Sequence, residues 1–533
     1  MAISGVQTEA IIMAAWIALI LGVGIRSKRR VKSTSEFMVG GRTIPVWMLA
    51  MWSAGAAVSA WGLLGLPGSV YESGAILDWS ICTPIIIGFP IAVIIIGRWM
   101  SISGRKYSMT TMPDFLGETY GGNLIRAFSA VGIVIACVFF ATAQFRAIGI
   151  LFSALFGINY TLAASIGIAI TLIYVLAGGF VAGSIINTFN VSIMIVAAII
   201  AVVLGYIWTG GYGNMLSVLS AGATGAQYMN VDAALGGTGW YFWVSWALIL
   251  SSFGLIGQPV VVQKMYGIKK PGSLWIWGLA SAIIFGIVCQ AYIYLGEVAR
   301  YLTITGQAPD IVKAFGSPDY VIPWLTVNKL GVEQPILGGI LIVGVIAAAW
   351  CTIDGLLMMG GAAIAKDVIN RCFRPNWSDR QLLLNLRLWM VIVGALMVVE
   401  TLFPVDIVNW LASIGWAQFA ATLAPALILG VLWKGVTKWG GTVGVLVGAT
   451  VAFVLTVLFR LPQSFLSPFG LGATGFLQAF YLDAGAWGFL AGAASIIVVS
   501  LLTKKERGPL YYDIHEIRKE TVPTGGEGAG VKT

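Results

Sequence analysis

Long apolar stretches separated by short polar ones set the pattern of this chain. Thirteen of them are apolar over enough residues to cross about 30 Å of hydrocarbon as a helix. We therefore predict membrane spans at 9–26, 45–66, 78–97, 125–155, 160–177, 188–208, 240–262, 273–302, 336–366, 383–402, 406–433, 437–458 and 485–503. The first has no basic stretch before it and no small-residue cleavage site after it, so we interpret it as a retained span rather than a signal peptide.

Two of these spans are interrupted at their centres by small, polar or helix-breaking residues. The interruptions are Ser53–Ala60 in one span and Gly254–Pro259 in another. Backbone polar groups inside a bilayer need partners, so an unwound helix is tolerated where it lines a cavity and its freed groups bind something. The pattern therefore predicts a transporter whose binding site lies at the two breaks.

Composition supports a polytopic membrane protein. Apolar residues make up 58% of the chain and charged residues only 10%, with a mean hydropathy of +0.90. These values exclude an ordinary soluble domain. We expect an all-α protein with the lipid bilayer as its surroundings.

Lys and Arg collect in alternate loops, as they do on the cytoplasmic side of membrane proteins. With thirteen spans and the N-terminus outside, the basic loops are all cytoplasmic, and only Lys313, Lys329 and Arg460 depart from the pattern. The 209–239 loop, predicted to be external, has no basic residue. The net charge of +9 thus reflects topology and anionic lipid headgroups, and it gives no support to nucleic-acid binding.

Other chemistry is sparse. Four of the five cysteines fall within spans and one in a cytoplasmic loop, which leaves no disulfide framework or zinc spacing. The lone histidine, His515, lies in the polar tail 504–533, which is too short for a folded domain and is predicted to be disordered. We expect no organic cofactor and no metal other than an alkali cation.

Several strings resemble the sodium/solute symporter family, most closely its bacterial proline and pantothenate transporters. The segment Ser53–Gly68 resembles the broken first core helix, and Gly257-Gln258-Pro259 with Gln263-Lys264 resembles the broken sixth. The other similar strings are Thr111–Leu116, of the form T-x-P-x-F-L, Gly178–Phe180, Ala347–Asp354 with Lys366-Asp367, and Leu411–Pro425. They stand in the family's order and spacing over nearly the whole chain.

The resemblance implies a core of five plus five helices related by an inverted repeat, with the first and sixth core helices broken. It divides the chain into an additional N-terminal helix and cytoplasmic loop at 1–44, a first repeat at 45–208, the external loop at 209–239, a second repeat at 240–433, two additional helices at 434–503 and the tail. The two interrupted spans then occupy equivalent positions of the two repeats, as a site near the middle of the membrane requires.

The resemblance also implies a sodium site between the first and eighth core helices. Its ligands would be the carbonyls of Gly55, Val58 and Ala348 with the side chains of Cys351 and Thr352. Oxygen ligands suit a hard cation. The alternative is that Thr352 only bonds its own helix.

Three residues depart from the family pattern at this site. Cys351 replaces a hydroxyl and offers a weaker ligand for a hard ion. Ala57 stands where many members have a polar or acidic residue, and Asn187 precedes Thr188 where members often have an aspartate. Because intramembrane carboxylates normally hold cations, we expect at most one coupled sodium ion.

Arg146 is the outstanding charge inside an apolar span. Such an arginine usually faces a water-filled cavity or an anion, where its planar fork can hold a carboxylate. Because the third core helix lines the family's substrate cavity, we expect Arg146 to bind a carboxylate of the solute. The alternative is a structural arginine that pairs with a carboxylate of another helix.

The remaining substrate-site residues are expected at the helix breaks. They are Ala57 and Ser59 in the first and Trp243, Ser251 and Gln258 in the sixth core helix. Trp243 and Ser251 are eight residues apart, which allows a common helical face toward the cavity.

Three functions are compatible with these features: a sodium-coupled importer of a small carboxylate such as an amino acid or monocarboxylate, a proton-coupled or uncoupled carrier, and a transporter-like sensor. The sodium-coupled importer in a bacterial-type inner membrane is favoured. A sensor would need a longer signalling module than the tail, and no nucleophile and base are paired as an enzyme requires. For a proton-coupled carrier the candidate acids are Asp354, expected to be a structural partner, and Glu400 and Asp406, expected near the outer surface. The solute and the oligomeric state are not specified.

The charge pattern generates a topology prediction. In a variant that lacks the native cysteines, a cysteine in the 209–239 loop should react with a membrane-impermeant thiol reagent added outside intact cells, because this loop has no basic residue. A cysteine in the tail or in the 26–44 loop should react only after the cytoplasmic side is opened. Labelling of the 209–239 cysteine from the cytoplasmic side alone would contradict the thirteen-span topology.

Overall fold

The computed structural model describes residues 5–27, 33–221, 225, 239–401, 408–460 and 483–520. These residues form helices connected by short loops, and the described part of the chain contains one isolated parallel β-bridge, between Ile44 and Ile268. The elements up to the external loop are α1 (Gly5–Ser27), α2 (Thr34–Val39), η2 (Gly40–Arg42), α3 (Val46–Ala60), η3 (Trp61–Gly65), α4 (Leu66–Ser73), α5 (Ala75–Ala92), η4 (Val93–Gly97), α6 (Arg98–Lys106), α7 (Met112–Tyr120), α8 (Asn123–Phe156), α9 (Tyr160–Thr209) and α10 (Tyr212–Ala221).

The second half has a similar helical content. Its elements are α13 (Gly239–Trp243), η5 (Val244–Phe253), η6 (Gly254–Gly257), α14 (Pro259–Val262), η7 (Gln263–Gly267), η8 (Pro271–Ser273), α15 (Leu274–Ile304), α16 (Ile311–Phe315), η9 (Pro318–Tyr320), α17 (Val321–Pro323), η10 (Trp324–Leu330), α18 (Gly331–Glu333), α19 (Pro335–Ala362), η11 (Ala363–Phe373), α20 (Asp379–Thr401), α21 (Val408–Leu432), α22 (Lys438–Arg460), α24 (Ala484–Leu502) and α25 (Pro509–Glu520).

The helices agree with the predicted spans in position. Eleven described helices are long and apolar enough to cross a membrane, or twelve if the bent pair Val244–Gly257 and Pro259–Gly267 is one span. The predicted span at 160–177 falls on the shorter apolar helix Tyr160–Ile173, the first part of α9, which is kinked at Gly179 with a φ of 50°. The count of thirteen therefore stays a prediction at this segment.

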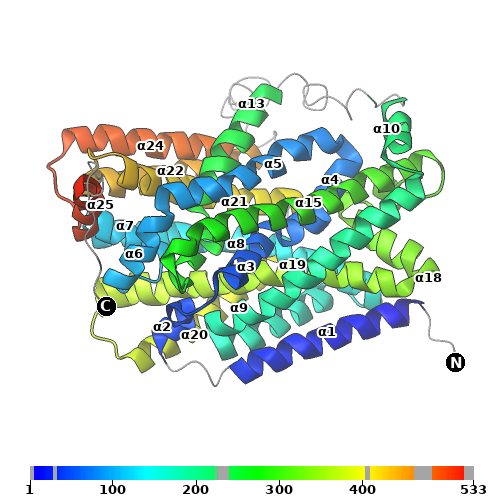
Figure 1. Ribbon diagram of the computed structural model, residues 1–533, viewed down its shortest axis with the longest axis horizontal. Helices are drawn as coiled ribbons and strands as arrows, with labels where there is room; N and C mark the ends of the chain where they lie inside the picture. The colour runs from blue at the N-terminus through cyan, green and yellow to red at the C-terminus, as the bar shows by residue number, and fades with distance from the viewer. Residues whose placement is uncertain are drawn as a thin grey trace, which may run out of the picture.

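Three helices form the centre of the bundle. Most residues of α3, α19 and α21 are buried, whereas most residues of α1 and α20 are at least partly exposed. Figure 1 shows α1 along one edge of the molecule and α24 along the opposite edge, with α3, α8 and α19 between them. Exposed Ile and Val side chains on the peripheral helices face the position of the lipid.

Both predicted helix breaks are confirmed. In α3, Ser59 has a φ of 52° and a ψ of −177°, which no helix contains, and the chain continues through the wide turn η3. In the sixth core helix, the π-helix η5 tightens into the 3₁₀-helix η6, and Gln258 is extended before α14 begins at Pro259. The two parts of that span are bent by 52°.

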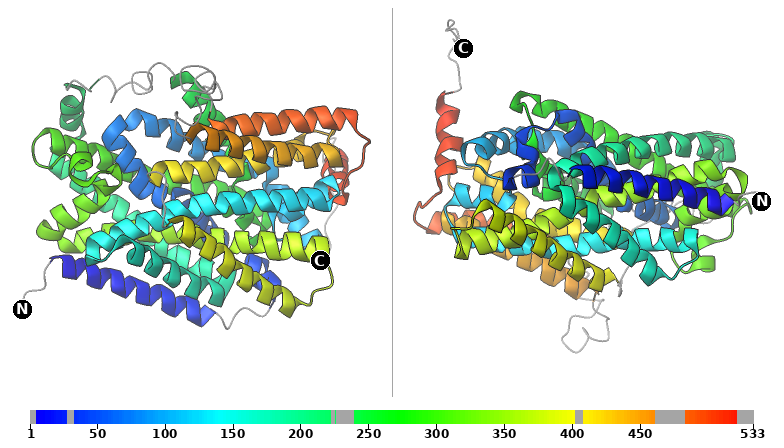
Figure 2. Two further views of the ribbon diagram at one scale, coloured as in Figure 1. Left: turned by 180° about the vertical axis from the view of Figure 1, so that it is seen from behind. Right: turned by 90° about the horizontal axis from the view of Figure 1, so that it is seen from below.

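The C-terminal tail corrects one expectation. The segment 504–533 was predicted to be disordered, but residues Pro509–Glu520 form α25, which lies across one end of the bundle (Figure 2). Asp513 accepts hydrogen bonds from Lys106 Nζ at 2.8 Å and Tyr107 Oη at 2.7 Å. Burial acts to raise the pKa of Asp513, but these bonds outweigh it and lower the pKa. The docking site on α6 and α7 supplies the order that the polar sequence does not reveal. Residues 521–533 lie outside the described residues.

Small residues allow the last helices to pack closely. A methyl group on Gly448 of α22 would lie 2.5 Å from the carbonyl oxygen of Ala421 in α21 and 3.2 Å from that of Gly488 in α24. These neighbours are backbone atoms of three packed helices and cannot move independently. Close contacts of this kind are typical of membrane helices that pack through small residues.

We predict that Gly448→Ala destabilises the protein by about 1–3 kcal/mol, the range for overpacking a rigid site. Gly22→Ala is the matched control, because a methyl group at Gly22 of α1 would meet no atom within 4 Å. The measurement is thermal unfolding of purified protein in detergent. Equal apparent melting temperatures for the two variants would contradict close packing at Gly448.

Candidate functional site

The break in α3 leaves backbone amides that side chains satisfy. The amide of Ala60 donates to Gln144 Oε1 at 2.8 Å, and the amide of Trp61 is shared between Ser59 Oγ at 3.0 Å and the carbonyl of Val58. Ser59, Ala60 and Gln144 are fully buried. The left-handed φ of Ser59 costs an L-residue of order 1–3 kcal/mol, and such strain is a feature of functional sites. The break is therefore stabilised by side-chain hydrogen bonds, which a bound ligand could replace.

The second break carries polar atoms without partners. Gln258 Nε2 donates to the carbonyl of Trp416 at 2.9 Å, but within the described residues its buried Oε1 has no hydrogen-bond partner. The buried hydroxyl of Ser251 is also unpartnered there. Buried polar atoms in proteins are normally satisfied, so these two groups are available to a bound molecule or water.

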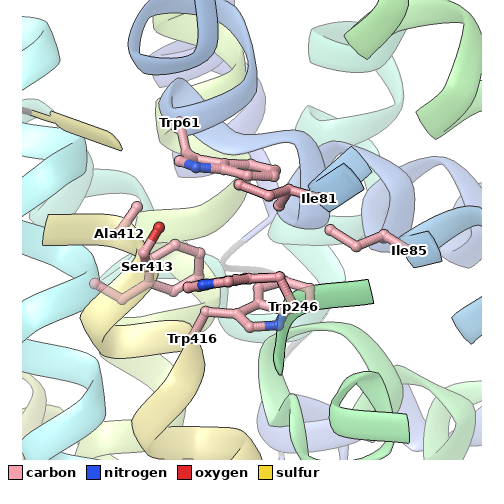
Figure 3. Close-up of a pocket in the computed structure, with 8 residues that line it drawn as sticks. Trp61, Ile81, Ile85, Trp246, Ala412, Ser413 and Trp416 are labelled. Carbon is pink, nitrogen blue, oxygen red and sulfur yellow. The ribbon is translucent and has the colours of Figure 1, made fainter. Parts of the chain in front are cut away.

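A pocket lies between the two breaks. It is nearly closed, with a cavity volume of about 10 Å³, which is room for about one water molecule. It is lined by Trp61, Ile81, Ile85, Phe140, Trp246, Ala412, Ser413 and Trp416. Figure 3 shows the ring of Trp61 on one side and the rings of Trp246 and Trp416 on the other, with the isoleucines closing one end. The wall is aromatic and apolar apart from the Ser413 hydroxyl, which donates to the carbonyl of Asn409 at 2.8 Å.

Fixed hydrogen bonds orient the tryptophan rings of this pocket. Trp61 Nε1 donates to Asn409 Oδ1 at 2.6 Å, and Trp416 Nε1 donates to the carbonyl of Leu250 at 2.9 Å. Phe140 packs edge-on against Trp416 with ring centroids 6.3 Å apart. Because both indole N–H groups are used, these rings present faces rather than donors to the cavity.

None of the six residues expected to contact the substrate lines this pocket. Ser59 and Gln258 instead bond residues of its wall: Ser59 accepts from the backbone amide of Trp61, and Gln258 donates to the carbonyl of Trp416. Ala57 is fully buried in α3. The polar residues at the breaks thus position the aromatic residues that face the cavity. Trp416 belongs to the segment Leu411–Pro425 that resembles the family, but nothing in its sequence context marks it as a pocket residue.

Trp243 is on the exterior, with 47% of its surface exposed, and it does not line the pocket. The shared face of Trp243 and Ser251 stays a prediction. Trp243 ends α13, and the π-helix η5 begins at Val244. Its i→i+5 bonding widens each turn, so residues eight apart no longer keep their α-helical angular relation. Trp246 faces the pocket in place of Trp243.

Arg146 has a carboxylate partner on another element. Its Nε donates to Asp319 Oδ2 at 3.0 Å, and Asp319, only 1% exposed, also accepts from the amide of Val408 at 3.3 Å. This is the structural pairing that sequence analysis kept as the alternative. Asp319 lies in the short η9 between spans, where no periodicity connects it to Arg146. Whether Arg146 also holds a solute carboxylate stays a prediction.

The structure brings Thr352 and Cys351 of α19 against the first break, and the sodium site itself stays a prediction. Thr352 Oγ1 donates to the carbonyl of Ala56 in α3 at 3.1 Å and to that of Ala348 in its own helix at 3.3 Å. A methyl group on Gly55 would lie 3.0 Å from Cys351 Sγ, so α3 and α19 are in direct contact here. Val58, Ala348, Cys351 and Thr352 are all fully buried. The hydroxyl faces the first break as well as bonding its own helix.

A buried lysine and a buried aspartate lie beside this position. Lys264 Nζ donates to the carbonyl of Trp52 at 3.1 Å and lies 4.4 Å from the centre of the Trp52 ring. Asp354 accepts from Trp52 Nε1 at 3.3 Å and from Asn187 Nδ2. Asp354 thus joins α19 to α3 and α9, an arrangement compatible with the expected structural role, which stays a prediction. The sequence places Lys264 just after the predicted span 240–262, among the basic residues of a cytoplasmic loop, but its side chain is buried. A buried lysine next to a helix break is itself a functional signal.

Charged residues also meet at the basic ends of the spans. Lys366 contacts Asp114 and Thr110, and Arg371 Nε lies 3.5 Å from Asp114. Thr111 Oγ1 donates to Asp367 Oδ1 at 2.8 Å. The segments Thr111–Leu116 and Lys366-Asp367, which both resemble the family, are thus in contact at this end of the bundle. The side chain of Glu400 and the whole of Asp406, the other candidate acids, lie outside the described residues.

Comparisons with known proteins agree with this architecture. The family model described as "Sodium:solute symporter family" matches residues 37–448. The high-affinity proline transporter PutP of Bacillus subtilis is 25% identical over 501 residues, which cover 90% of this chain and 95% of that protein. A sodium/proline symporter of Staphylococcus aureus is also 25% identical, and the match covers 95% of both chains.

Solved structures share the fold. A Na⁺-coupled sialic acid symporter, in a substrate-bound outward-open state, superposes with a TM-score of 0.74 at 14% identity, over 94% of this chain and 99% of that one. Mhp1, a nucleobase-cation-symport-1 family transporter, gives a TM-score of 0.51 at 15% identity, over 90% of this chain and 95% of that one.

These likenesses confirm the helical membrane fold with its five-plus-five core and broken first and sixth core helices. A family match over residues 37–448 covers well over half of the sequence. This multi-pass membrane protein belongs to the sodium:solute symporter family.

Proposed function

We propose that this protein imports a small carboxylate-bearing solute together with one sodium ion by alternating access. The observation that carries the proposal is the position of the α3 break. It lies between the aromatic pocket, through Trp61, and the hydroxyl of Thr352, which bonds the carbonyl of Ala56. A single unwound segment can therefore contact a solute on one side and a cation on the other.

Sodium would be held where α3 meets α19. The carbonyls of Gly55, Val58 and Ala348 and the hydroxyl of Thr352 supply oxygens, and Cys351 supplies a sulfur that suits a hard ion less well. The Thr352 hydroxyl now donates to Ala56 and Ala348, so it would turn its lone pair toward the ion on binding. With Ala57 and Asn187 in place of carboxylates, we infer a single sodium ion.

The pocket would take the apolar part of the solute. Three tryptophans and Phe140 line it, which favours a compact apolar body such as the ring of proline, the solute named for the relatives. The cavity of about 10 Å³ must widen to admit that body, as an alternating-access cycle requires. The solute's carboxylate would bind the amides of Ala60 and Trp61, where Gln144 and Ser59 now serve as acceptors. Helix breaks with exposed amides are suited to anionic groups.

Contacts at both ends would break in turn during the transport cycle. Arg146 and Asp319 join α8 to η9 at one end, and Lys366, Asp114 and Arg371 join η11 to α7 at the other. Charged pairs of this kind hold a closed state without an apolar seal, because each partner can be rehydrated when its side opens.

The buried Lys264 and Asp354 favour a proton-coupled carrier as the second candidate function. Both are at least 97% buried and both bond Trp52 next to the expected ion ligands. A buried ionisable group can bind or release a proton when its surroundings change. Sodium and proton gradients distinguish the two functions.

In proteoliposomes, uptake of a labelled small carboxylate such as proline should require an inward sodium gradient. Thr352→Ala should raise the sodium concentration for half-maximal uptake by about tenfold, equivalent to about 1.4 kcal/mol, because it removes a hydroxyl oxygen. Cys351→Ser should lower that concentration, since oxygen suits the ion better than sulfur.

The matched control for this experiment is Thr171→Ala. Thr171 is fully buried, and its hydroxyl bonds the carbonyl of Gly167 one turn earlier in α9. This variant should keep the parent's sodium dependence. Uptake by the parent with a proton gradient alone would favour the second candidate function, and unchanged sodium dependence in Thr352→Ala would count against the site.

Arg146→Ala and Asp319→Asn should have the same effect if the pair closes one side of the transporter. We expect both variants to transport about tenfold more slowly, the scale of one lost charge-assisted bond, and to keep the parent's preference for an acid over its neutral amide. The preference is measured as binding to purified, monodisperse protein. If Arg146→Ala alone loses it, Arg146 holds the solute's carboxylate, as its place in the span first predicted.

A further inference from the structure

A second hollow lies away from the pocket, beside the end of α9 that carries Thr209. It is lined by Val202, Tyr206, Tyr212, Gln290, Ile293, Tyr294 and Glu297, and it holds about 720 Å³ including its open mouth. Its walls come from α9, α10 and α15. Figure 1 shows α10 standing next to the ends of the other two helices.

Glu297 is the outstanding residue of this hollow. Only 7% of it is exposed, and within the described residues it makes no hydrogen bond and no ion pair. The nearby basic residues are engaged elsewhere: Arg300 lies over the ring of Tyr71, and Lys329 pairs with Glu333 at 3.0 Å. A buried carboxylate without a partner is costly, so a ligand that supplies a positive charge would stabilise the fold.

The spacing along α15 directs three polar side chains to the same hollow. Gln290, Tyr294 and Glu297 follow one another at intervals of four and three residues, which is one face of an α-helix. The rings of Tyr294 and Tyr212 are 6.1 Å apart and tilted by 43°. Burial, the negative charge of Glu297 and Tyr294 together raise the pKa of Tyr212, which lies outside the spans in α10. The carboxylate is thus surrounded by ring faces and neutral hydroxyls.

We infer from its tyrosines that the mouth of the hollow lies at the level of the membrane surface. Tyr206 is 62% exposed and Tyr212 is 51% exposed, at the point where α9 ends and α10 begins. Tyrosines are typical of the headgroup region, because their rings tolerate hydrocarbon while their hydroxyls reach water. Val202 continues the open side one turn deeper, where an acyl chain would lie.

We propose that this hollow binds a primary organic ammonium group, with an aminophospholipid such as phosphatidylethanolamine as its source in the membrane. The ammonium group donates to the Glu297 carboxylate and to the tyrosine hydroxyls, and it lies against the tyrosine rings. A trimethylated (quaternary) ammonium group, such as that of phosphatidylcholine, has no N–H to donate and would lose the hydrogen bond to Glu297. The described residues contain no group of three metal-ligating side chains, which disfavours a divalent cation.

A ligand bound in the hollow would affect the first core helix through α15, which contacts both. Gly296 is the residue before Glu297, and a methyl group there would lie 2.4 Å from the carbonyl oxygen of Pro67 in α4. The helix that carries the carboxylate is therefore in backbone contact with the second part of the broken helix. A bound headgroup would hold this contact in place and raise the thermal stability of the transporter.

The experiment uses the purified full-length protein in nanodiscs of phosphatidylglycerol alone or mixed with either phosphatidylethanolamine or phosphatidylcholine. Lipid retained by the protein is counted by native mass spectrometry, and thermal unfolding is followed in parallel. We expect retention of phosphatidylethanolamine about tenfold above phosphatidylcholine, the scale of one charge-assisted bond, and a higher melting temperature with it. Equal retention of the two lipids would overturn the proposal, and this arm needs no variant.

Glu297→Gln keeps the shape of the side chain and removes its charge, so it should abolish the preference for phosphatidylethanolamine. Glu333→Gln is the matched control, because it removes a carboxylate from the same end of the molecule outside the hollow. Glu297→Gln with an unchanged preference would overturn the proposal. Ethanolamine added to discs of phosphatidylglycerol alone distinguishes the sources: stabilisation at millimolar concentration supports a soluble amine as a ligand, and stabilisation by the phospholipid only supports the lipid.

Discussion

Everything in this fold depends on the need to satisfy backbone hydrogen bonds where water is absent. A straight helix meets that need by itself, but α3 and the sixth core helix do not continue as straight helices. Side chains supply the missing partners: Gln144 and Ser59 at the first break, and Gln258 toward the carbonyl of Trp416 at the second. These bonds connect α3 to α8 and η6 to α21. The same hydrogen bonds therefore connect the helices in this state and are the ones that must break if the helices move apart during transport.

Buried charged groups are also satisfied by partners from other elements. Buried charged residues meet across elements that are distant in sequence, such as Lys366 with Asp114 and Arg146 with Asp319. Pairs of this kind add little stability compared with apolar contacts, but breaking one partner away leaves a costly buried charge. They favour discrete arrangements over gradual ones. A transporter that must be either open or closed at each end needs this property.

Much of the fold could be read from the sequence because membrane physics leaves few options. Apolar runs predicted the helices, small and polar residues inside two of them predicted the breaks, and the family pattern placed Thr352 opposite α3. What failed depended on information that a one-dimensional pattern lacks. Asp319 lies in a short loop segment with no periodicity to connect it to Arg146, and α25 is ordered by its docking site rather than by its own polar sequence. Trp243 is exposed and Trp246 lines the pocket, a difference that the apolar pattern around the π-helix η5 does not reveal.

That π-helix has a consequence for how sites in this family can diversify. A π-turn is equivalent to one residue inserted into an α-helix without a change in the ends of the helix. Moving the turn along η5 would rotate a new set of side chains toward the cavity while both flanking segments kept their contacts. Two relatives with spans of equal length could thus present different residues to their solutes at aligned positions. Substrate specificity could then change because different residues of the same helix face the cavity, without substitution of the residues that lined it before.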